Sequence, residues 1–290
     1  MAESDADRPA IDALLPDAMA RKAEAAGVAK AQRDPVRLFA LAVLAGAFIA
    51  FGALFSTIVG AGAGELPYGV GRLLVGLVFA LGLILVVVGG AELFTGDVLM
   101  VMAWASRRLR LPAMLRAWAI IYVGNFIGAC GTAVLVFLSG QYRFGGGAVG
   151  AAALALAGAK LRLPFWDALM LGVLCNVLVC LAVWASLSAR SVTDKVAILI
   201  LPVAAFVAAG FEHSIANMYV IPLGLMIDAA APDAFWAALG RVSEGLGVAA
   251  LLDFARNLVA VTIGNMIGGG VLVAAVYWFI YLRDVPPPQR

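Results

Sequence analysis

The chain has 290 residues, of which 64% are apolar and only 13% charged, and its mean hydropathy is +1.01. Such a small share of polar side chains cannot cover the surface of a water-soluble domain. The composition therefore indicates a membrane protein. The net charge of +2 comes from 20 basic and 18 acidic residues, which argues against the basic face that nucleic-acid binding requires.

The amino-terminal residues 1–35 are expected to form a cytoplasmic segment. They contain no apolar core ahead of a small-residue cleavage site, so we expect no cleavable signal peptide. Within them, a helix over residues 9–33 would place four apolar side chains on one face: Ile11, Leu14, Leu15 and Met19. This pattern predicts a short amphipathic helix on the membrane or under a pore, with a partly ordered tail as the alternative.

Six uncharged apolar runs follow, most of them close to the ~20 residues that a helix needs to cross hydrocarbon. The runs cover residues 38–60, 73–91, 117–140, 168–189, 196–211 and 257–282. We therefore expect residues 36–283 to form one all-α transmembrane domain of six helices. Residues 284–290 would then be a cytoplasmic tail.

The second and fifth runs each continue past an acidic residue, Glu92 and Glu212 respectively. An unbroken helix over residues 73–106 would be about 50 Å long at ~1.5 Å per residue, well beyond a ~30 Å hydrocarbon core. We therefore expect both helices to break. Gly96 and Gly210 would supply the backbone freedom, and the two acids would accept the N–H groups that the breaks leave without partners.

The two halves of the domain resemble each other. Gly-Asn-Phe-Ile-Gly at 124–128 in the third run returns as Gly-Asn-Met-Ile-Gly at 264–268 in the sixth. Three spans per half would make the repeat inverted, which is typical of channels and transporters whose pathway lies at the repeat interface. The alternative is that the motif only packs helices through its small residues.

Basic residues are more numerous on the side that holds both termini, so the positive-inside rule places both termini in the cytoplasm. The opposite side collects fewer: Arg72, Arg143, Lys160, Arg162, Arg241 and Arg256.

His213 is the only histidine in the chain, and it follows the acid that interrupts the fifth run. An ionisable group at membrane depth is a functional candidate, because charging it in a low dielectric is costly. A neutral histidine that binds backbone groups at the break is the alternative. Thr95 lies at the matching break of the first half, so we expect the two side chains to face each other. Among the asparagines within spans, we assign Asn176 to the pathway and the others to helix packing.

Four segments carry a family resemblance: Gly-Ala-Glu-Leu-Phe-Thr-Gly at 90–96, Asn-Val-Leu-Val-Cys-Leu-Ala-Val-Trp at 176–184, Gly-Phe-Glu-His-Ser-Ile-Ala-Asn-Met at 210–218 and Val-Thr-Ile-Gly-Asn-Met-Ile-Gly-Gly-Gly at 261–270. Together they resemble the formate/nitrite transporter family, and most closely its formate channel branch. The resemblance implies a homopentamer of six-helix protomers with an aquaporin-like fold in the bacterial inner membrane. Each protomer would have its own pore for small monovalent anions or their acids.

The resemblance also assigns roles to single residues. The central histidine of the pore matches His213 and its threonine partner matches Thr95. The pore asparagine matches Asn176, and the lysine that attracts anions into the periplasmic vestibule matches Lys160. The two apolar constrictions match five residues: Leu83 and Phe94 on the cytoplasmic side, and Phe79, Val179 and Phe206 on the periplasmic side.

Two apolar rings around one histidine would obstruct a bare anion, because desolvating a charge costs several kcal/mol. We therefore hypothesise that formate takes a proton at or near His213 and crosses as formic acid, or that water delivers the proton if burial keeps the histidine neutral. A nitrite or hydrosulfide channel with the same pore is the alternative, and a neutral-solute channel is a more remote one. We expect neither an enzyme, nor a metal site, nor a cofactor, because the residues form no catalytic dyad, thiol pair or ligand set.

Overall fold

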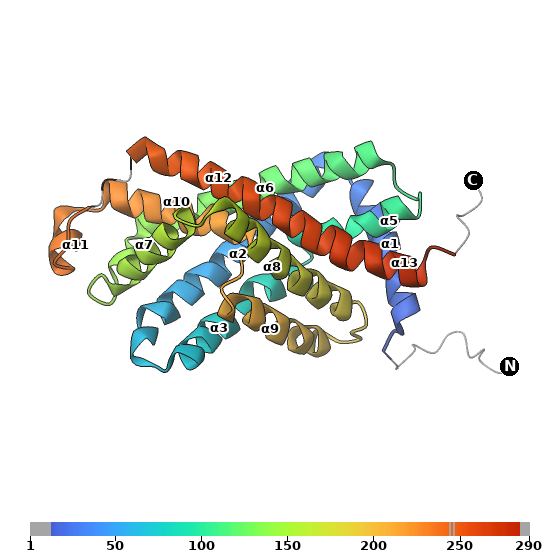
Figure 1. The fold of residues 1–290 in the computed structure, drawn as a ribbon, viewed down its shortest axis with the longest axis horizontal. Helices are drawn as coiled ribbons and strands as arrows, with labels where there is room; N and C mark the ends of the chain where they lie inside the picture. The colour runs from blue at the N-terminus through green and yellow to red at the C-terminus, as the bar shows by residue number, and fades with distance from the viewer. Residues whose placement is uncertain (1–12, 244, 246, 285–290) are drawn as a thin grey trace.

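The computed structural model describes residues 13–243, 245 and 247–284 of the chain. Every regular element in these residues is a helix, so the expected all-α class is confirmed (Figure 1). Residues 9–12 of the expected amphipathic segment and residues 285–290 of the expected tail lie outside the described part.

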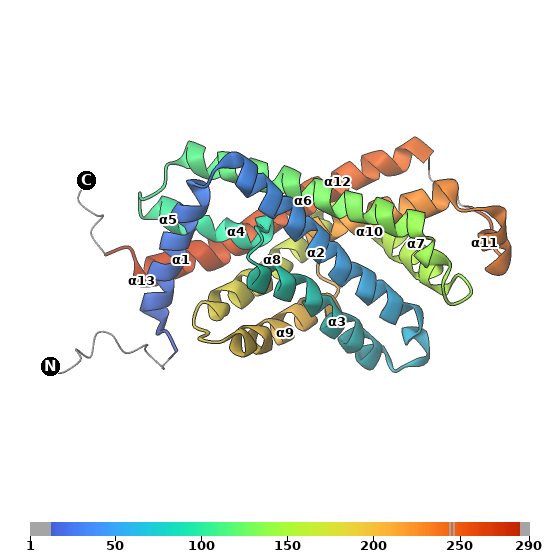
Figure 2. The same ribbon diagram turned by 180° about the vertical axis from the view of Figure 1, so that it is seen from behind.

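Helices α1 (Pro16–Ala31) and α13 (Val276–Tyr281) lie at one end of the molecule. Helices α7 (Ala148–Leu161) and α11 (Asp233–Ala238) lie at the opposite end, as both views show (Figures 1 and 2). The two ends define two sides from which the interior can be approached.

Helix α1 lies inside the segment expected to be amphipathic, and it packs against the helix bundle. Its neighbours include α5 (Val101–Ala105) and α13. Met19 is buried among apolar residues that include Met102 of α5, whereas Leu15 is exposed just before the helix. The apolar face therefore only partly follows the predicted pattern.

Five helical segments are long and apolar enough to cross a membrane: α2 (Pro35–Ala61), α3 (Tyr68–Gly89), α6 (Leu111–Ser139), α8 (Phe165–Ser186) and the segment Ala249–Tyr281. The last joins α12 (Gly247–Met266), a π-helical stretch (Ile267–Ala275) and α13. The fifth predicted run instead forms α9 (Val192–Ala208) and the following segment forms α10 (Ser214–Ala230), each of 17 residues. Short 3-10 turns complete the connections: Ala63–Glu65, Val98–Met100 and Gln141–Arg143.

Two glycines with left-handed backbone end the helices before each interruption. Gly90, with φ of +74°, follows α3, and Gly210, with φ of +77°, lies two residues after α9 ends. Glycine adopts this conformation freely because it lacks a Cβ atom. Gly210 thus has the backbone freedom we expected of it, but Gly96 does not provide the first break. It lies inside the short helix α4 (Phe94–Asp97), and Gly90 takes the expected role.

After each of these glycines the chain is non-helical for three residues, 91–93 in the first half and 211–213 in the second. The helix then resumes as α4, which leads into α5, and as α10. Residues 93–95 and 213 therefore lie at interrupted helix ends, where main-chain groups need partners from elsewhere.

The repeated glycine motif packs helices in both halves. A Cβ atom added at Gly124 would lie 2.5 Å from the Cβ of Ala42, so α6 and α2 approach closely there. A Cβ atom at Gly264 would overlap the main chain of Leu169, so α12 and α8 approach in the same way. The small residues of the motif therefore serve close helix contacts.

Candidate functional site

His213 and Thr95 meet in the interior. The Nε2 atom of His213 lies 2.9 Å from the Oγ1 atom of Thr95, and both side chains are buried. The Nδ1 atom of His213 accepts the main-chain N–H of Ala216 at 3.1 Å and caps α10. Because Nδ1 accepts, the proton of the neutral ring is on Nε2, which therefore donates to Thr95. The geometry favours a neutral imidazole, since a second proton on Nδ1 would face the N–H of Ala216.

Two side chains of α8 hold Thr95 in place. The Nδ2 atom of Asn176 donates to the carbonyl oxygen of Thr95 at 3.1 Å, and the Sγ of Cys180 donates to the same oxygen at 3.3 Å. Asn176 also donates to the carbonyl of Asn265 at 2.6 Å. Asn176 therefore lies behind Thr95 and fixes its main chain. Cys180 lies inside an apolar run, and nothing in the local sequence indicates this contact with Thr95.

Asn125 pairs main-chain groups at the first break with its side-chain amide. Its Oδ1 accepts the N–H of Phe94 at 2.9 Å, and its Nδ2 donates to the carbonyl of Glu92 at 2.9 Å and to that of Ala42 at 2.7 Å. One buried amide thus pairs three main-chain groups, two of which belong to the break.

Asn265 repeats this arrangement at the second break. Its Oδ1 accepts the N–H of Ser214 at 3.0 Å, and its Nδ2 donates to the carbonyls of Glu212 at 3.0 Å and Gly172 at 2.8 Å. The two asparagines occupy the same place in the two copies of the repeated motif. We had assigned both to helix packing, although their recurrence in the motif was the available signal.

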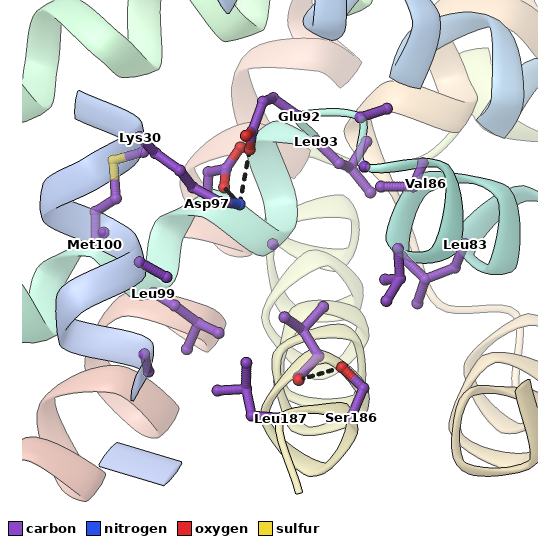
Figure 3. Close-up of a pocket in the computed structure, with 18 of the residues that line it drawn as sticks. Lys30, Leu83, Val86, Glu92, Leu93, Asp97, Leu99, Met100, Ser186 and Leu187 are labelled. Carbon is purple, nitrogen blue, oxygen red and sulfur yellow. Dashed lines mark hydrogen bonds and ion pairs between the residues drawn. The ribbon is translucent and has the colours of Figure 1, made fainter. Parts of the chain in front are cut away.

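The two acids at the breaks are held by cations from other parts of the chain. The carboxylate of Glu92 lies 2.7 Å from Lys30 and 2.5 Å from Arg33, and Lys30 also lies 2.5 Å from Asp97 (Figure 3). The carboxylates therefore accept from side chains, and the break asparagines pair the main chain instead. Burial opposes the charge of Lys30, but the attraction of Asp97 and Glu92 outweighs it and raises the pKa of Lys30 above its usual range.

The equivalent acid of the second half, Glu212, binds a lysine of α7. Its carboxylate lies 2.7 Å from the Nζ of Lys160, and it also accepts from the Nδ2 of Asn217 at 2.7 Å. The side chain of Lys160 is only 12% exposed. Lys160 is thus a buried ion-pair partner, and it also lines cavity 2, which is described next.

Two cavities lie on either side of the Thr95–His213 pair. Cavity 1, of about 330 Å³, lies on the side of α1, and Figure 3 shows both charged and apolar side chains in its lining. Cavity 2, of about 280 Å³, has its walls on α3, α7 and α9. His213 lines cavity 2, whereas Gly96, the residue after Thr95, lines cavity 1. The pair therefore lies between the two spaces.

The apolar residues expected at the constrictions divide into two groups. Leu83 lines cavity 1, and Phe79 and Phe206 line cavity 2 with their ring centroids 5.7 Å apart in an edge-to-face contact. Phe94 and Val179 line neither cavity. Phe94 packs against the rings of two α6 residues, Trp118 and Tyr122. The neighbouring Leu93, which the sequence did not single out, lines cavity 1 instead.

The sequence profile described as formate/nitrite transporter matches residues 17–279 of the chain. The chain belongs to the formate/nitrite transporter family. It is 48% identical to the formate channel FocA of Escherichia coli over 96% of this chain and 98% of that protein. It is 38% identical to the formate channel FocA of Haemophilus influenzae over 90% and 92% of the two chains.

Solved structures agree with this family assignment. A pentameric formate channel with formate bound superposes with a TM-score of 0.80 at 45% identity, covering 86% of this chain and 98% of that one. An ion channel of the same family superposes with a TM-score of 0.75 at 27% identity, covering 91% and 98%. The resemblance inferred from four sequence segments is therefore confirmed, as is a transport function rather than an enzymatic one.

Proposed function

We propose that this formate/nitrite transporter is a formate channel whose pathway runs from cavity 1 to cavity 2 between Thr95 and His213. The observation that carries the proposal is the position of this buried polar pair between two cavities that approach it from opposite sides. Leu83 and Leu93 narrow the pathway on one side, and Phe79 and Phe206 narrow it on the other.

We further propose six membrane crossings in an inverted repeat with an aquaporin-like arrangement. In this arrangement α9 and α10 together make the fifth crossing, because neither is long enough alone. The matching roles of Asn125 and Asn265 support a repeat of three crossings per half. Both termini would be cytoplasmic, so that cavity 1 opens to the cytoplasm.

A homopentamer in the bacterial inner membrane completes the proposal. The similar solved channel is pentameric, and this chain exposes large apolar side chains over its long helices, which suits contacts with lipid and with neighbouring protomers. Each protomer would keep its own pathway, because both cavities lie within one chain.

The apolar rings select against a bare anion, since desolvation of a charge is costly and favours the neutral acid. The main-chain N–H of Ala216 occupies Nδ1 of His213, and the positive end of α10 also opposes a charged ring. Cavity water therefore carries in, as hydronium, the proton that formate takes up near His213. The Nε2–H and the Thr95 hydroxyl then offer hydrogen bonds to formic acid, which crosses and returns its proton to water on the other side.

Stopped-flow uptake by proteoliposomes tests this function with formate, nitrite, hydrosulfide and lactate at several pH values. We expect formate uptake above that of empty liposomes, rising as the outer pH falls. Faster uptake of nitrite or hydrosulfide would favour the alternative substrates. Uptake that does not depend on pH would point to a neutral-solute channel and contradict the proposal.

A further inference from the structure

We propose that Arg72 provides the net positive charge that attracts small monocarboxylate anions into cavity 2. The inference rests on the proposed channel function and deepens it. Arg72 lies on the side opposite the expected cytoplasmic termini, and Lys160 of the same cavity is paired with Glu212.

Only part of the charge that lines cavity 2 is available to attract an anion at the mouth of the cavity. The lining contains one carboxylate, Glu212, and two cations, Arg72 and Lys160. Lys160 lies 2.7 Å from Glu212, and both side chains are largely buried. The two opposite charges sum to zero, so their fields largely cancel at distances well beyond their separation. The charge that remains to attract an anion from the mouth is that of Arg72.

Arg72 has no carboxylate partner among the residues that the structure describes. Its Nε donates to the carbonyl of Ala208 at 2.9 Å, and its Nη2 donates to the carbonyl of Val207 at 2.5 Å. These carbonyls end α9, where a cation is favourable. The two bonds fix the guanidinium without neutralising its charge.

The guanidinium retains donors for a ligand. Arginine has five N–H groups, and these two bonds use one on Nε and one on Nη2. Both N–H groups of Nη1 and one of Nη2 remain, and an end-on pair of such donors matches the two oxygens of a carboxylate. The chemistry therefore fits a small carboxylate better than a neutral solute.

The position of Arg72 places such an anion on the way to the central pair. A Cβ atom added at Gly210 would lie 3.4 Å from its Nη2, so the guanidinium is next to the second break. Phe79 lies two turns further along the same face of α3, about 10 Å away at ~1.5 Å per residue. An anion held at Arg72 would thus wait just outside the apolar ring.

Cavity 1 shows the same distribution of charge. Four of its charged lining residues are two cations and two anions that pair with each other: Lys30, Arg33, Glu92 and Asp97. Two further lysines line this cavity, Lys22 and Lys195. The Nζ of Lys22 donates to the carbonyl of Leu187 at the end of α8, just as Arg72 binds the end of α9. Burial and the nearby cations Lys195 and Arg190 lower the pKa of Lys22, as expected for a site with excess positive charge.

The test compares initial formate uptake by proteoliposomes at low formate concentration while an impermeant electrolyte raises the ionic strength. For Arg72→Gln we expect a rate about 3- to 10-fold lower at low ionic strength, with a weaker salt dependence. The maximal rate at saturating formate should change little. Arg72→Lys should keep the salt dependence of the wild type, because it keeps the charge. Arg143→Gln, on the same outer side but outside both cavities, is the matched control.

Val75→Glu provides a second variant that leaves Arg72 in place. Val75 lines the same cavity one turn along α3, so a glutamate there would neutralise the guanidinium. It should reproduce the loss seen in Arg72→Gln. Uptake rates are compared per assembled channel. If Arg72→Gln does not assemble, Val75→Glu tests the role of the Arg72 charge.

The outcomes separate the inference from the proposed function. Wild-type salt dependence in Arg72→Gln or Val75→Glu would overturn the role of Arg72. The same would follow if assembled Lys160→Gln alone lost the salt dependence. Absence of formate uptake by the wild type would instead contradict the proposed function.

Discussion

The Nε2 atom of His213 lies 2.9 Å from the hydroxyl oxygen of Thr95, although 118 residues separate them in sequence. Each residue lies at the end of an interrupted helix, and the two interruptions meet between two cavities. The contact depends on the backbone breaks and on the side chains behind them, and each of these can be tested separately.

A side chain should be destabilising at Gly90 and Gly210, whose φ angles are positive, but should be tolerated at Gly96, which lies inside a helix. We expect Gly90→Ala and Gly210→Ala each to lower the free energy of unfolding by about 1–2 kcal/mol, because alanine is strained at positive φ. Gly96→Ala is the matched control, since its Cβ would lie 3.5 Å from the Cγ2 of Val183, an ordinary contact. Thermal unfolding of the purified variants measures the difference. Equal effects at all three positions would contradict this interpretation of the breaks.

The two break asparagines should be equivalent in stability. Asn125→Leu and Asn265→Leu each remove three hydrogen bonds to buried main-chain groups, and such groups cost about 1–3 kcal/mol each when they lose their partners. We expect both variants to lose assembled protein and to unfold at much lower temperature. Gln141→Leu, near the surface, should have little effect. A stable, active Asn265→Leu variant would show that the amide is not needed to hold the second break.

Lys30 should hold α1 over cavity 1. Lys30→Gln removes the shared partner of Glu92 and Asp97, whose side chains are almost completely buried, so α1 should detach more readily. Hydrogen exchange of α1 should accelerate in this variant, and Arg21→Gln, in an exposed pair, should leave it unchanged.

The pH dependence of this contact follows from the raised pKa of Lys30. A raised value in the folded state means that the stabilisation is complete below the ordinary lysine value of 10.5 and is lost only as the pH rises through the higher value. Exchange of α1 should therefore not accelerate through loss of this charge between neutrality and about pH 10. Acceleration near pH 8 that Lys30→Gln abolishes would contradict this.

The π-helical stretch should control the position of Thr95 through α8. A Cβ atom at Gly269 would lie 2.6 Å from the Sγ of Cys180 and would also overlap Asn176, the two donors to the Thr95 carbonyl. We expect Gly269→Ala to displace Thr95 from His213. Because the chain has one histidine, ¹⁵N-histidine labelling gives the signals of this ring alone, and they should shift. Gly131→Ala, where the added Cβ meets nothing within 4 Å, should leave them unchanged.

Apolar runs and their length were sufficient to predict an all-helical membrane domain and two interruptions near Glu92 and Glu212. The sequence did not show which glycine makes the first break, because Gly90 and Gly96 both lie near the acid and only the backbone path distinguishes them. Likewise, the direction of adjacent side chains in a non-helical segment is not periodic, so Leu93 and Phe94 could not be told apart. The ion pair between Lys160 and Glu212 joins helix α7 to the second break. It depends on tertiary packing, which no local sequence pattern reveals.

The most direct test records formate uptake, luminal pH and membrane potential together in proteoliposomes containing the wild type or His213→Asn. For the wild type we expect uptake that rises as the outer pH falls, acidifies the lumen and moves no net charge. Asparagine can still cap α10, so the variant should assemble. Its smaller polar side chain replaces a ring stacked against Phe206 and should let the bare anion pass, with net charge movement and a weaker pH dependence. Charge-carrying uptake by the wild type at every pH, or an unaltered pH profile in well-assembled His213→Asn, would contradict passage as the neutral acid at this histidine.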